Sequence, residues 1–484
     1  MIIININTTK CNLIGNIDIS ILNQIDLECS YMHQGHAYMA RNTGSSWDGR
    51  VRLFKKNNTF PVGLLKRVCS IFNKNKVKYK IHDNRDNIKY GKSLSVDERC
   101  KIVPRDYQIL AKKKAVDSGS GIIKIATGGG KTAVISTLVA HYNIKTVIYV
   151  IGIELLYQMK STLEYMYPDL EVGIVGDGIC DIRQVNIATI WSAASAFNKK
   201  IEILDNDCTK DTNLANIDKK KVRDMVSEAE LFILDECQYA AANTVQFLHE
   251  NSINARHRFL FSASPWRDTG DDILIEAVGG PKVFDLSAST LIDRNFLVKP
   301  EIHFMNVPIM KNMPKNYQQV YQKYIVENDD RNEIIVNCVK KLVEAKKKVL
   351  VLVVRVSHGK LLMNLLKDKF KVEFLDGQKS TKDRLSSIEK MKSGELEVLV
   401  ASKIFDQGVD IPQLDALVLA GSGKSTGRAL QRIGRVIRKH PGKERAIVVE
   451  FFDNCKYLRD HSEVRMSVYK TEPSFIIKNP KKKK

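Results

Sequence analysis

The stretch IATGGGKTAVI, residues 125–135, decides the fold expected of this chain. It follows a short run of apolar residues, GIIKIA (121–126), and leads into a helical pattern. A glycine-rich turn between a strand and a helix directs backbone N–H groups toward a phosphate chain. The context therefore predicts a P-loop, and with it an α/β fold built on a parallel sheet.

The residues of this turn have distinct expected roles. Lys131 neutralises the β- and γ-phosphates, and the hydroxyl group of Thr132 ligates magnesium. The remaining nucleotide contacts are expected from Ala126, Thr127, Gly128, Gly129 and Gly130. The strict P-loop pattern has glycine where this chain has Ile125, so a glycine-rich turn that binds nothing is the alternative.

A second motif, FILDECQYAA (232–241), ends an apolar run in two adjacent carboxylates, Asp235 and Glu236. Ionised carboxylates are costly to bury, so a cation or a proton is expected beside them. Downstream of a P-loop they fit a Walker-B pair, in which Asp235 holds Mg²⁺ through its water shell and Glu236 orients and deprotonates the attacking water. Two acids that cap an exposed strand by chance are the alternative.

Short apolar runs alternate with helical patterns beyond about residue 100. The first series of candidate strands is 121–126, 145–151, 185–189, 231–235 and 258–264. The second series is 348–354, 371–377, 396–402, 414–420 and 445–452. Runs that are apolar on both faces are typical of parallel strands covered by helices on each side, so two tandem doubly wound α/β domains are expected.

The expected domain boundaries lie where this pattern changes. It breaks near LIDRNFLVKPEI (291–302), where Pro300 interrupts it, and the polar stretch HDNRDNIKYGKS (82–93) separates off a first region rich in Asn and Lys. The expected parts are a small N-terminal α/β domain (1–95), a first doubly wound domain (96–290), a second one (291–478) and a basic tail (479–484).

The composition of the 484 residues narrows the class of partner. A net charge of +21, from 76 Lys and Arg against 55 Asp and Glu, favours a polyanion, because each phosphate contacted releases condensed counterions. A solvated basic surface is the alternative. The nine cysteines form no CxxC pair, which favours reduced thiols in a cytoplasmic compartment over zinc or disulfides. Neither a secretory signal nor the roughly 18 apolar residues of a membrane span is found.

A basic segment, QRIGRVIR (431–438), lies in the second α/β series. Its Gln431, Arg435 and Arg438 follow one another at spacings of four and three, which predicts one face of a helix. Guanidinium groups that reach a γ-phosphate from a second domain act as arginine fingers and make hydrolysis depend on closure of the interdomain cleft. A solvent-exposed basic helix is the alternative.

With these three elements in order, residues 100–455 resemble the superfamily 2 helicases and translocases. The resemblance implies two RecA-like domains, with ATP and Mg²⁺ as cofactors. PRDYQ (104–108) resembles the segment that contacts adenine, through Gln108 and Arg105, and SASPWR (262–267) resembles motif III, which couples hydrolysis to strand handling.

Two further motifs complete this resemblance. SKIFDQGVDIP (402–412) resembles motif V, which implies that Gly408 and Asp410 approach the nucleotide while Ser402 and Lys403 approach the nucleic-acid backbone. The DECQ motif departs from the usual DECH or DEAH at Gln238. The usual histidine links the nucleotide site to motifs III and VI by hydrogen bonds, and an amide with a donor and an acceptor is able to take that role.

The N-terminal region carries a closer resemblance, to phage recombination helicases of the UvsW type. WDGRVRLF (47–54) and FPVGLL (60–65) resemble their small N-terminal domain, and VSHGK (356–360) resembles their motif IV region. Thr189, Ser357 and His358 are backbone contacts by this resemblance alone.

Trp47 has two possible roles within this N-terminal region. Beside Arg50 and Arg52, it is able to stack on an unpaired base while the arginines bind phosphates. The interpretation we favour is that Trp47 packs in the core of this small domain, with Asp48-Gly49 as a hairpin turn.

The function implied is that of an ATP-dependent DNA helicase that binds branched DNA, moves 3′ to 5′ and drives branch migration or fork regression. If the protein is encoded by a phage, its expected location is the host cytoplasm. An RNA helicase and a duplex translocase that does not separate strands are rivals within the same class of motor enzymes. A nucleic-acid-binding scaffold with vestigial motifs is the rival outside that class.

Overall fold

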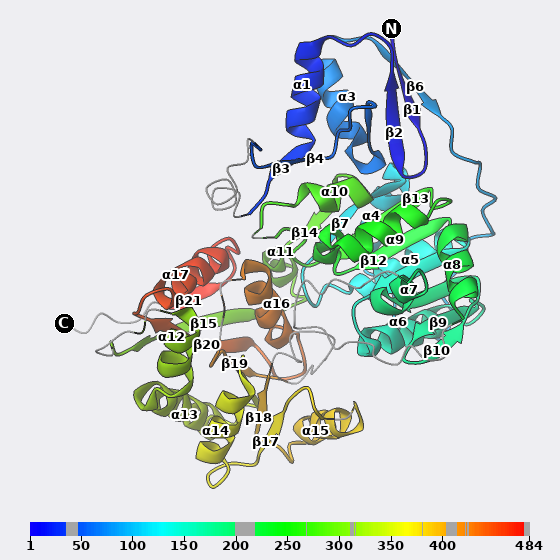
Figure 1. The fold of residues 1–484 in the computed structure, drawn as a ribbon. Helices are drawn as coiled ribbons and strands as arrows, with labels where there is room; N and C mark the ends of the chain where they lie inside the picture. Colours follow the sequence, from blue (N-terminus) through cyan, green and yellow to red (C-terminus); the bar gives the residue numbers. More distant parts are fainter. Residues whose placement is uncertain are drawn as a thin grey trace. The chain divides into compact units, whose positions relative to one another are not determined.

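The computed structural model describes residues 1–34, 47–198, 218–267, 269–309, 314, 316–379, 381–402, 414–421, 423 and 425–478. The chain divides into two compact units, which change over between Asp285 and Leu286 (Figure 1). The P-loop residues Ala126–Gly129 group with the second unit. No helix in the described ranges is both long and apolar enough to span a bilayer.

The first unit begins with a small four-stranded sheet in the order β5-β2-β1-β6. Its strands are β1 (Ile2–Ile6), β2 (Lys10–Ile14), β5 (Thr59–Pro61) and β6 (Tyr79–Asp83). Alternate residues of β1 are buried, as expected for a sheet with one covered face, and the helices α1 (Ile19–Glu28) and α3 (Leu65–Lys74) supply residues to the same core. A separate short hairpin pairs β3 (Ser30–Met32) with β4 (Arg50–Arg52).

An eight-stranded sheet forms the rest of the first unit, in the order β10-β9-β11-β8-β12-β13-β7-β14. The strands are β7 (Ser120–Ile125), β8 (Thr146–Val150), β9 (Val172–Gly176), β10 (Ile179–Asp181), β11 (Val185–Thr189), β12 (Leu231–Asp235), β13 (His257–Ser262) and β14 (Lys282–Leu286). β7 and β12 each pair in parallel with β13, which lies between them. The carboxyl ends of β7 and β12 therefore lie at the same edge of the sheet.

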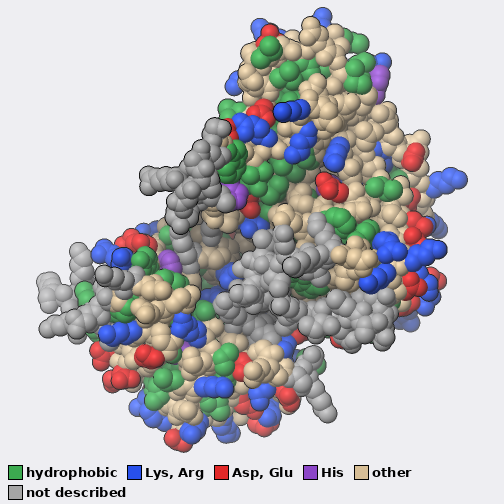
Figure 2. All heavy atoms as spheres, viewed as in Figure 1, with side chains coloured by type: hydrophobic (Ala, Val, Ile, Leu, Met, Phe, Trp, Pro, Cys, Tyr) green, Lys and Arg blue, Asp and Glu red, His purple; other side chains and the backbone are tan. Residues whose placement is uncertain are grey.

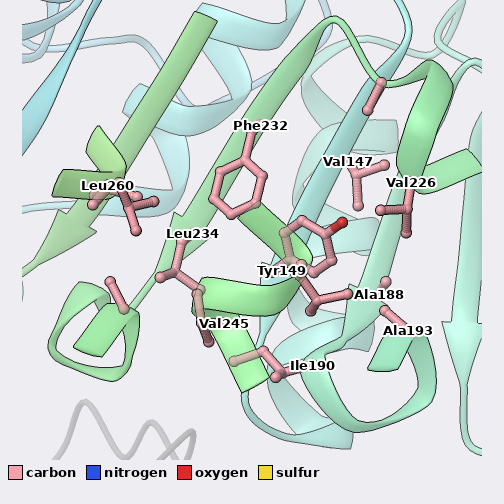
Figure 3. Close-up of a cluster of buried hydrophobic side chains, with 14 of the residues drawn as sticks. Val147, Tyr149, Ala188, Ile190, Ala193, Val226, Phe232, Leu234, Val245 and Leu260 are labelled. Atoms are coloured by element: carbon pink, nitrogen blue, oxygen red, sulfur yellow. The ribbon is translucent and has the colours of Figure 1, made fainter. Parts of the chain in front are cut away.

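Helices cover this sheet. They are α4 (Asp106–Ser118), α5 (Lys131–Tyr142), α6 (Ile153–Met166), α7 (Ile190–Ser195), α8 (Lys219–Glu228), α9 (Asn243–Asn251) and α10 (Ile273–Gly279), with the short turn η2 (Cys237–Ala241). Figure 3 shows the side chains of Tyr149, Phe232 and Leu234 on one face of the sheet, packed against residues of these helices such as Val226 and Val245. This packing fixes the strand ends that carry the site.

The second unit contains a seven-stranded sheet in the order β17-β18-β16-β19-β20-β15-β21. All of its strand pairs are parallel. The strands are β15 (Lys299–Val307), β16 (Val349–Leu352), β17 (Val372–Leu375), β18 (Val398–Ala401), β19 (Ala416–Val418), β20 (Arg445–Asp453) and β21 (Ile476–Lys478).

The helices of the second unit flank this sheet. They are α11 (Ala288–Asp293), α12 (Tyr317–Tyr321), the π-helical turn η3 (Gln322–Val326), α13 (Asp329–Glu344), α14 (Val356–Leu366), α15 (Thr381–Ser393), α16 (Thr426–Val436) and α17 (Leu458–Tyr469). Residues of α13 and α14 share one core with the strands β16, β18, β19 and β20. The expected α/β class with two parallel sheets after a small N-terminal α/β sheet is therefore confirmed.

One part of the strand pattern differs from expectation. The stretch 291–302, expected to interrupt the pattern at Pro300, contains the start of the nine-residue strand β15. Polar and apolar residues alternate along β15, so a search for continuous apolar runs misses it. Pro300 fits because it is the second residue of the strand and precedes the first pair with β21, between Glu301 and Ile476.

Candidate nucleotide-binding site

The P-loop lies between β7 and α5, as the sequence predicts. Gly128 and Gly130 adopt φ values of +85° and +75°, a region that favours glycine, and the N–H of Gly129 donates to the carbonyl of Ala126 at 2.9 Å. Gly130 is the N-cap of α5, and Lys131 and Thr132 form the first turn of this helix. The N–H groups of a first helical turn have no partner within the helix, so this end of α5 favours an anion.

The acidic motif lies beside this loop. Asp235 is the last residue of β12, and Glu236 follows with φ +59°, at the start of η2. The Nζ atom of Lys131 lies 3.7 Å from Oε1 of Glu236, and both side chains are largely buried. The structure therefore brings together the cation and the carboxylates that the sequence places more than one hundred positions apart.

Burial makes the carboxyl group of Asp235 harder to ionise. Asp235 is only 6% exposed, and the pKa of its carboxyl group is raised to about 6, chiefly by burial; Lys131 opposes this rise and the carboxylate of Glu236 adds to it. The backbone N–H of Glu236 donates to Oδ1 of Asp235 at 3.0 Å. A carboxylate that resists ionisation in this place favours a bound cation that offsets the loss of solvation.

The residues present fit a magnesium ion. The carboxyl group of Asp235 and the hydroxyl group of Thr132 are hard oxygen ligands of the type that Mg²⁺ prefers. Within the described part of the chain, no cluster of three or more His, Cys, Asp or Glu side chains forms a metal site. Mg²⁺ usually takes one or two protein ligands and completes its shell with phosphate and water.

Gln238 joins the acidic motif to the end of β13. Its Nε2 donates to Oε2 of Glu236 at 3.0 Å, and its Oε1 accepts from the hydroxyl group of Ser262 at 2.8 Å. The same hydroxyl group accepts from the backbone N–H of Ser264 at 3.0 Å. The amide of Gln238 thus uses its donor on the carboxylate and its acceptor on the SASPWR segment, the pattern that its chemistry allows.

Gln108 holds the segment that precedes the P-loop. Its Oε1 accepts from the N–H of Arg105 at 2.7 Å, and its Nε2 donates to the carbonyl of Gly130 at 3.3 Å. The guanidinium group of Arg105, an exposed residue, donates to the hydroxyl group of Tyr107 at 2.8 Å. The buried amide of Gln108 therefore fixes the start of α4 to the N-cap of α5.

The basic helix of the second unit is α16. Gln431 and Arg435 lie on it and are half-buried. Arg438 lies beyond its last residue, Val436, in a single β-bridge to Leu297, so the prediction that one helix carries all three residues is wrong for Arg438. The carbonyl of Ile437 accepts from the N–H of Val298 at 2.9 Å. This hydrogen bond to the residue that precedes β15 takes the place of a further helical turn.

Of the four motif V residues named from the sequence, one is among the described residues. Lys403, Gly408 and Asp410 fall outside the described residues, as does the basic tail (479–484). Ser402 is described and buried at 6% exposure, directly after β18, where its N–H donates to the carbonyl of Leu375 at 3.0 Å.

The predicted backbone contacts differ in exposure. Thr189 is fully buried as the N-cap of α7, where its hydroxyl group accepts from the N–H of Ser192 at 3.1 Å. His358 is fully buried on α14, with Nε2 2.9 Å from Oδ1 of Asn332, and burial lowers its pKa to about 3. Ser357 is exposed. Of the three, the described conformation presents only Ser357 to a ligand.

Trp47 does not pack in the core of the small domain, so the interpretation favoured from the sequence is wrong on this point. The ring is 38% exposed, lies edge-on to His33, and its Nε1 donates to the carbonyl of Arg50 at 2.9 Å. Apolar residues of β1, β2, α1 and α3 fill the core without it. Asp48 and Gly49 immediately precede β4, where Oδ1 of Asp48 accepts from the N–H of Arg50.

Arg50 and Arg52 also have partners within the hairpin region. Arg52 donates to both carboxyl oxygens of Asp48 and, through Nε, to Asp26 at 2.7 Å. Arg50 donates to the hydroxyl group of Ser30 at 3.1 Å. These contacts join both guanidinium groups to side chains of α1, β3 and the turn before β4.

Arg267, the last residue of the SASPWR segment, contacts the acidic motif although it is not among the predicted site residues. Its Nη1 donates to the carbonyl of Gln238 at 3.4 Å, and its Nε lies 3.3 Å from Oδ1 of Asp271. Arg267 ends a motif that the sequence shows, but its contact with the backbone carbonyl of Gln238, in the turn η2, leaves no trace in sequence spacing.

Comparisons with known proteins place this site in a family. A family model described as "Type III restriction enzyme, res subunit" matches residues 101–267, and one described as "Helicase conserved C-terminal domain" matches residues 330–440. The first range contains the P-loop and DECQ, and the second contains α16. The chain belongs to the superfamily 2 ATP-dependent helicases.

Two relatives match this chain over more residues than the two family models do. "ATP-dependent DNA helicase uvsW" of Enterobacteria phage T4 is 26% identical over 445 residues, which cover 88% of this helicase and 86% of the relative. "DNA 3'-5' translocase XPB2" of Sulfurisphaera tokodaii is 25% identical over 376 residues, which cover 70% of this helicase and 79% of the relative.

A solved structure supports the fold alone. "ATP-dependent Type ISP restriction-modification enzyme LlaBIII bound to DNA" superposes with a TM-score of 0.55 at 14% identity, over 80% of this helicase and 32% of that chain. The two parallel sheets of this helicase are accordingly RecA-like, which confirms the fold expected from the resemblance.

Proposed function

We propose that this helicase acts on DNA, with branched or forked duplexes as its substrate, moves 3′ to 5′ and drives branch migration or fork regression. The observation that carries the enzymatic part is the contact of Lys131 with Glu236 beside a buried Asp235, beyond the carboxyl ends of β7 and β12, two parallel strands that flank β13. The DNA part draws on the printed names of the two relatives and on the net charge of +21.

The residues divide into proposed roles by unit. In the first unit, Lys131 binds the β- and γ-phosphates, Asp235 and Thr132 hold Mg²⁺, and Glu236 orients and deprotonates water. Gln108 and Arg105 lie at the adenine. In the second unit, Gln431, Arg435 and Arg438 are the proposed γ-phosphate contacts, together with Gly408 and Asp410 of motif V.

The proposed cycle follows from this division. A bound magnesium ion neutralises phosphate charge, and the residues of this chain supply the base and the cations around it. Since the two RecA-like units contribute separate groups, binding of ATP closes them and cleavage releases them. The parts proposed are the N-terminal DNA-binding domain (1–95), the first motor domain (96–290), the second motor domain (291–478) and the basic tail.

The distribution of charged side chains does not by itself mark a path for DNA, so the proposal for DNA contact uses individual residues. On the face drawn in Figure 2, Lys and Arg side chains are dispersed among acidic ones over both units. The exposed ring of Trp47, with Arg50 and Arg52 beside it, is the aromatic and cationic combination that recognises unpaired bases. We assign this hairpin region to contact with the DNA junction.

The test is the ATPase rate of the purified full chain with a forked duplex, single-stranded DNA, linear duplex and single-stranded RNA. Forked DNA is expected to stimulate the rate most. Lys131→Ala is expected to remove stimulated turnover, and Glu236→Gln is expected to bind ATP without cleaving it, with a loss of about 10²–10⁴-fold in kcat. Equal turnover with and without DNA contradicts the proposal.

A duplex translocase is the second candidate, because the family model that matches residues 101–267 is described by a restriction enzyme subunit. A translocase displaces a triplex-forming strand from linear duplex without opening a fork. Measurement of triplex displacement and fork unwinding on the same preparation separates these two functions, and stimulation by RNA alone identifies an RNA helicase.

A further inference from the structure

Helix α10 lies between the acidic motif and the N-terminal domain, all within the first unit (Figure 1). On one side it contacts η2, the turn that follows Asp235 and Glu236. On the other side it contacts η1 (Val62–Leu64), the turn that leads into α3. Because α10 contacts both turns, a displacement of η2 is able to shift α10 and, through it, η1.

The contacts on the ATP side begin at Gln238. Nη1 of Arg267 donates to its carbonyl, and the same guanidinium group pairs with Asp271 at 3.3 Å. The backbone N–H of Arg267 donates to Oδ1 of Asp272, the N-cap residue of α10, at 2.7 Å.

A second bridge runs from η2 to α10. The amide of Gln246 donates to the carbonyl of Ala240 in η2 at 2.7 Å and to the carbonyl of Leu274 in α10 at 3.0 Å. A shift of η2 therefore changes hydrogen bonds at the first turn of α10.

The contacts on the N-terminal side are apolar and close. Ile273 and Ala277, one helical turn apart, belong to the same buried core as Leu64 and Val68 of the N-terminal domain. Gly63 approaches so closely that an added Cβ atom would lie 2.0 Å from the carbonyl oxygen of Glu276. Apolar burial and the lack of room for a methyl group fix the N-terminal domain to α10.

An ion pair also joins α3 of the N-terminal domain to α10. Nη2 of Arg67, on α3, lies 2.5 Å from Oε2 of Glu276, and Nε of Arg67 donates to the other carboxyl oxygen at 3.4 Å. Glu276 is 16% exposed, so this two-point contact is less screened than a surface pair.

We propose that α10 couples the ATP site to the N-terminal domain, so that the state of the acidic motif changes the affinity of that domain for branched DNA, with Arg267 and the Arg67–Glu276 pair as positioning residues. This inference rests on the proposed function for its DNA ligand. By linkage, branched DNA then changes the affinity for ATP by the same factor.

The experiment measures the Kd of the full chain for a fluorescein-labelled fork, with and without a non-hydrolysable ATP analogue. The ratio of the two values is the coupling factor. Arg67→Ala and Glu276→Gln are expected to bring this factor at least about threefold closer to one, while basal ATPase activity is unchanged. The charge-swapped pair, Arg67→Glu with Glu276→Arg, is expected to restore part of the lost coupling.

Lys10→Ala is the matched control. Lys10 and Glu250 form a pair of 3.8 Å between the N-terminal sheet and α9, more than half exposed on both sides and separate from α10. It is expected to leave the coupling factor at the wild-type value. If both Arg67→Ala and Glu276→Gln also keep the wild-type factor, the proposal is overturned.

A measurement on the unaltered protein covers variants that fail to fold. Hydrogen exchange without DNA is expected to show that the ATP analogue alters protection in η1 and α3, and unchanged protection there overturns the coupling. If wild type binds no forked DNA, the proposed function fails instead, and the exchange result still decides whether α10 transmits the state of the ATP site.

Discussion

Gln238 donates a hydrogen bond from Nε2 to Oε2 of Glu236 at 3.0 Å. The carbonyl oxygen of the same amide accepts from the hydroxyl group of Ser262 at 2.8 Å. A glutamine thereby connects the proposed catalytic base to the SASPWR segment. Unlike histidine, it cannot gain a charge near neutral pH.

We expect Gln238→Leu to lower kcat for ATP hydrolysis by about tenfold with little change in KM, less than the roughly 10²–10⁴-fold expected for loss of the base itself. The leucine leaves Glu236 in place but removes the group that orients it. Steady-state ATPase kinetics with saturating DNA provide the measurement. Gln238→His, which keeps a donor, is the matched variant and should retain most of the rate; equal kinetics for both variants would exclude an orienting role.

The buried His257 is expected to make the first unit less stable at acidic pH. Its Nδ1 donates to the carbonyl of Gly119 and its Nε2 accepts from the hydroxyl group of Tyr90, both at 2.8 Å, and burial lowers its pKa from 6.5 to about 4. Below pH 6.5 the unfolded chain binds a proton that the folded chain does not. The stability contributed by neutral His257 is therefore complete above pH 6.5 and is lost as the pH falls toward 4.

Urea unfolding at pH 7.5 and pH 4.5 measures this loss, which we expect to reach about 2–3 kcal/mol for this residue. His257→Gln should flatten that part of the pH dependence, because an amide does not titrate. Tyr90→Phe is the control, since it removes one hydrogen bond and leaves the imidazole buried. An unchanged pH dependence in His257→Gln would assign the acid sensitivity to other groups.

The buried pair Arg331–Asp453 is expected to dominate the stability of the second unit. Nε of Arg331 donates to Oδ1 of Asp453 at 2.8 Å, its Nη1 donates to the carbonyl of Ala420, and the guanidinium group lies 4.5 Å from the ring centre of Phe451. Arg331→Met should cost about 3–5 kcal/mol, because it leaves a buried carboxylate without its cation.

Thermal and urea unfolding of Arg331→Met, Asp453→Leu and the double variant give the interaction energy of the pair. The double variant should recover much of the loss, since two apolar side chains leave no unpaired charge. Additive losses would mean that the two residues stabilise the unit independently.

Substitution of Trp47 distinguishes a role in DNA binding from a role in the stability of the fold. With 38% of the side chain exposed and no place in the core, Trp47→Ala should change the free energy of unfolding by less than about 1 kcal/mol. The same variant should weaken binding of a fork with an unpaired arm by at least about fivefold, the loss expected for one stacked base.

Fluorescence anisotropy with a fork and with a fully paired duplex tests this difference. The fully paired duplex should bind Trp47→Ala as it binds wild type, because it offers no base for stacking. Trp47→Phe, which keeps an aromatic face, is the matched variant. Equal losses on both DNAs would assign Trp47 to a general contact with the phosphate backbone.

The central strands and the nucleotide loop could be predicted because each depends on local chemistry. VNIAT (185–189) and LFILD (231–235) coincide with β11 and β12, since buried parallel strands need continuous apolar residues. Gly128 and Gly130 mark the loop because only glycine readily adopts their positive φ values. By contrast, β15 alternates polar and apolar residues and was missed, and the end of α16 before Arg438 depends on a contact with Leu297, far away in sequence.

By itself, the sequence determined the α/β class, the loop for the triphosphate and the acidic pair that follows it, because backbone conformation and strand burial are written in neighbouring residues. Only the tertiary structure decided that Gln238 holds Glu236 and Ser262, that Thr189 and His358 are buried while Trp47 is exposed, and that α10 shares the core of the N-terminal domain. These outcomes depend on which distant side chains meet across the fold, and residue spacing along the chain does not encode such meetings.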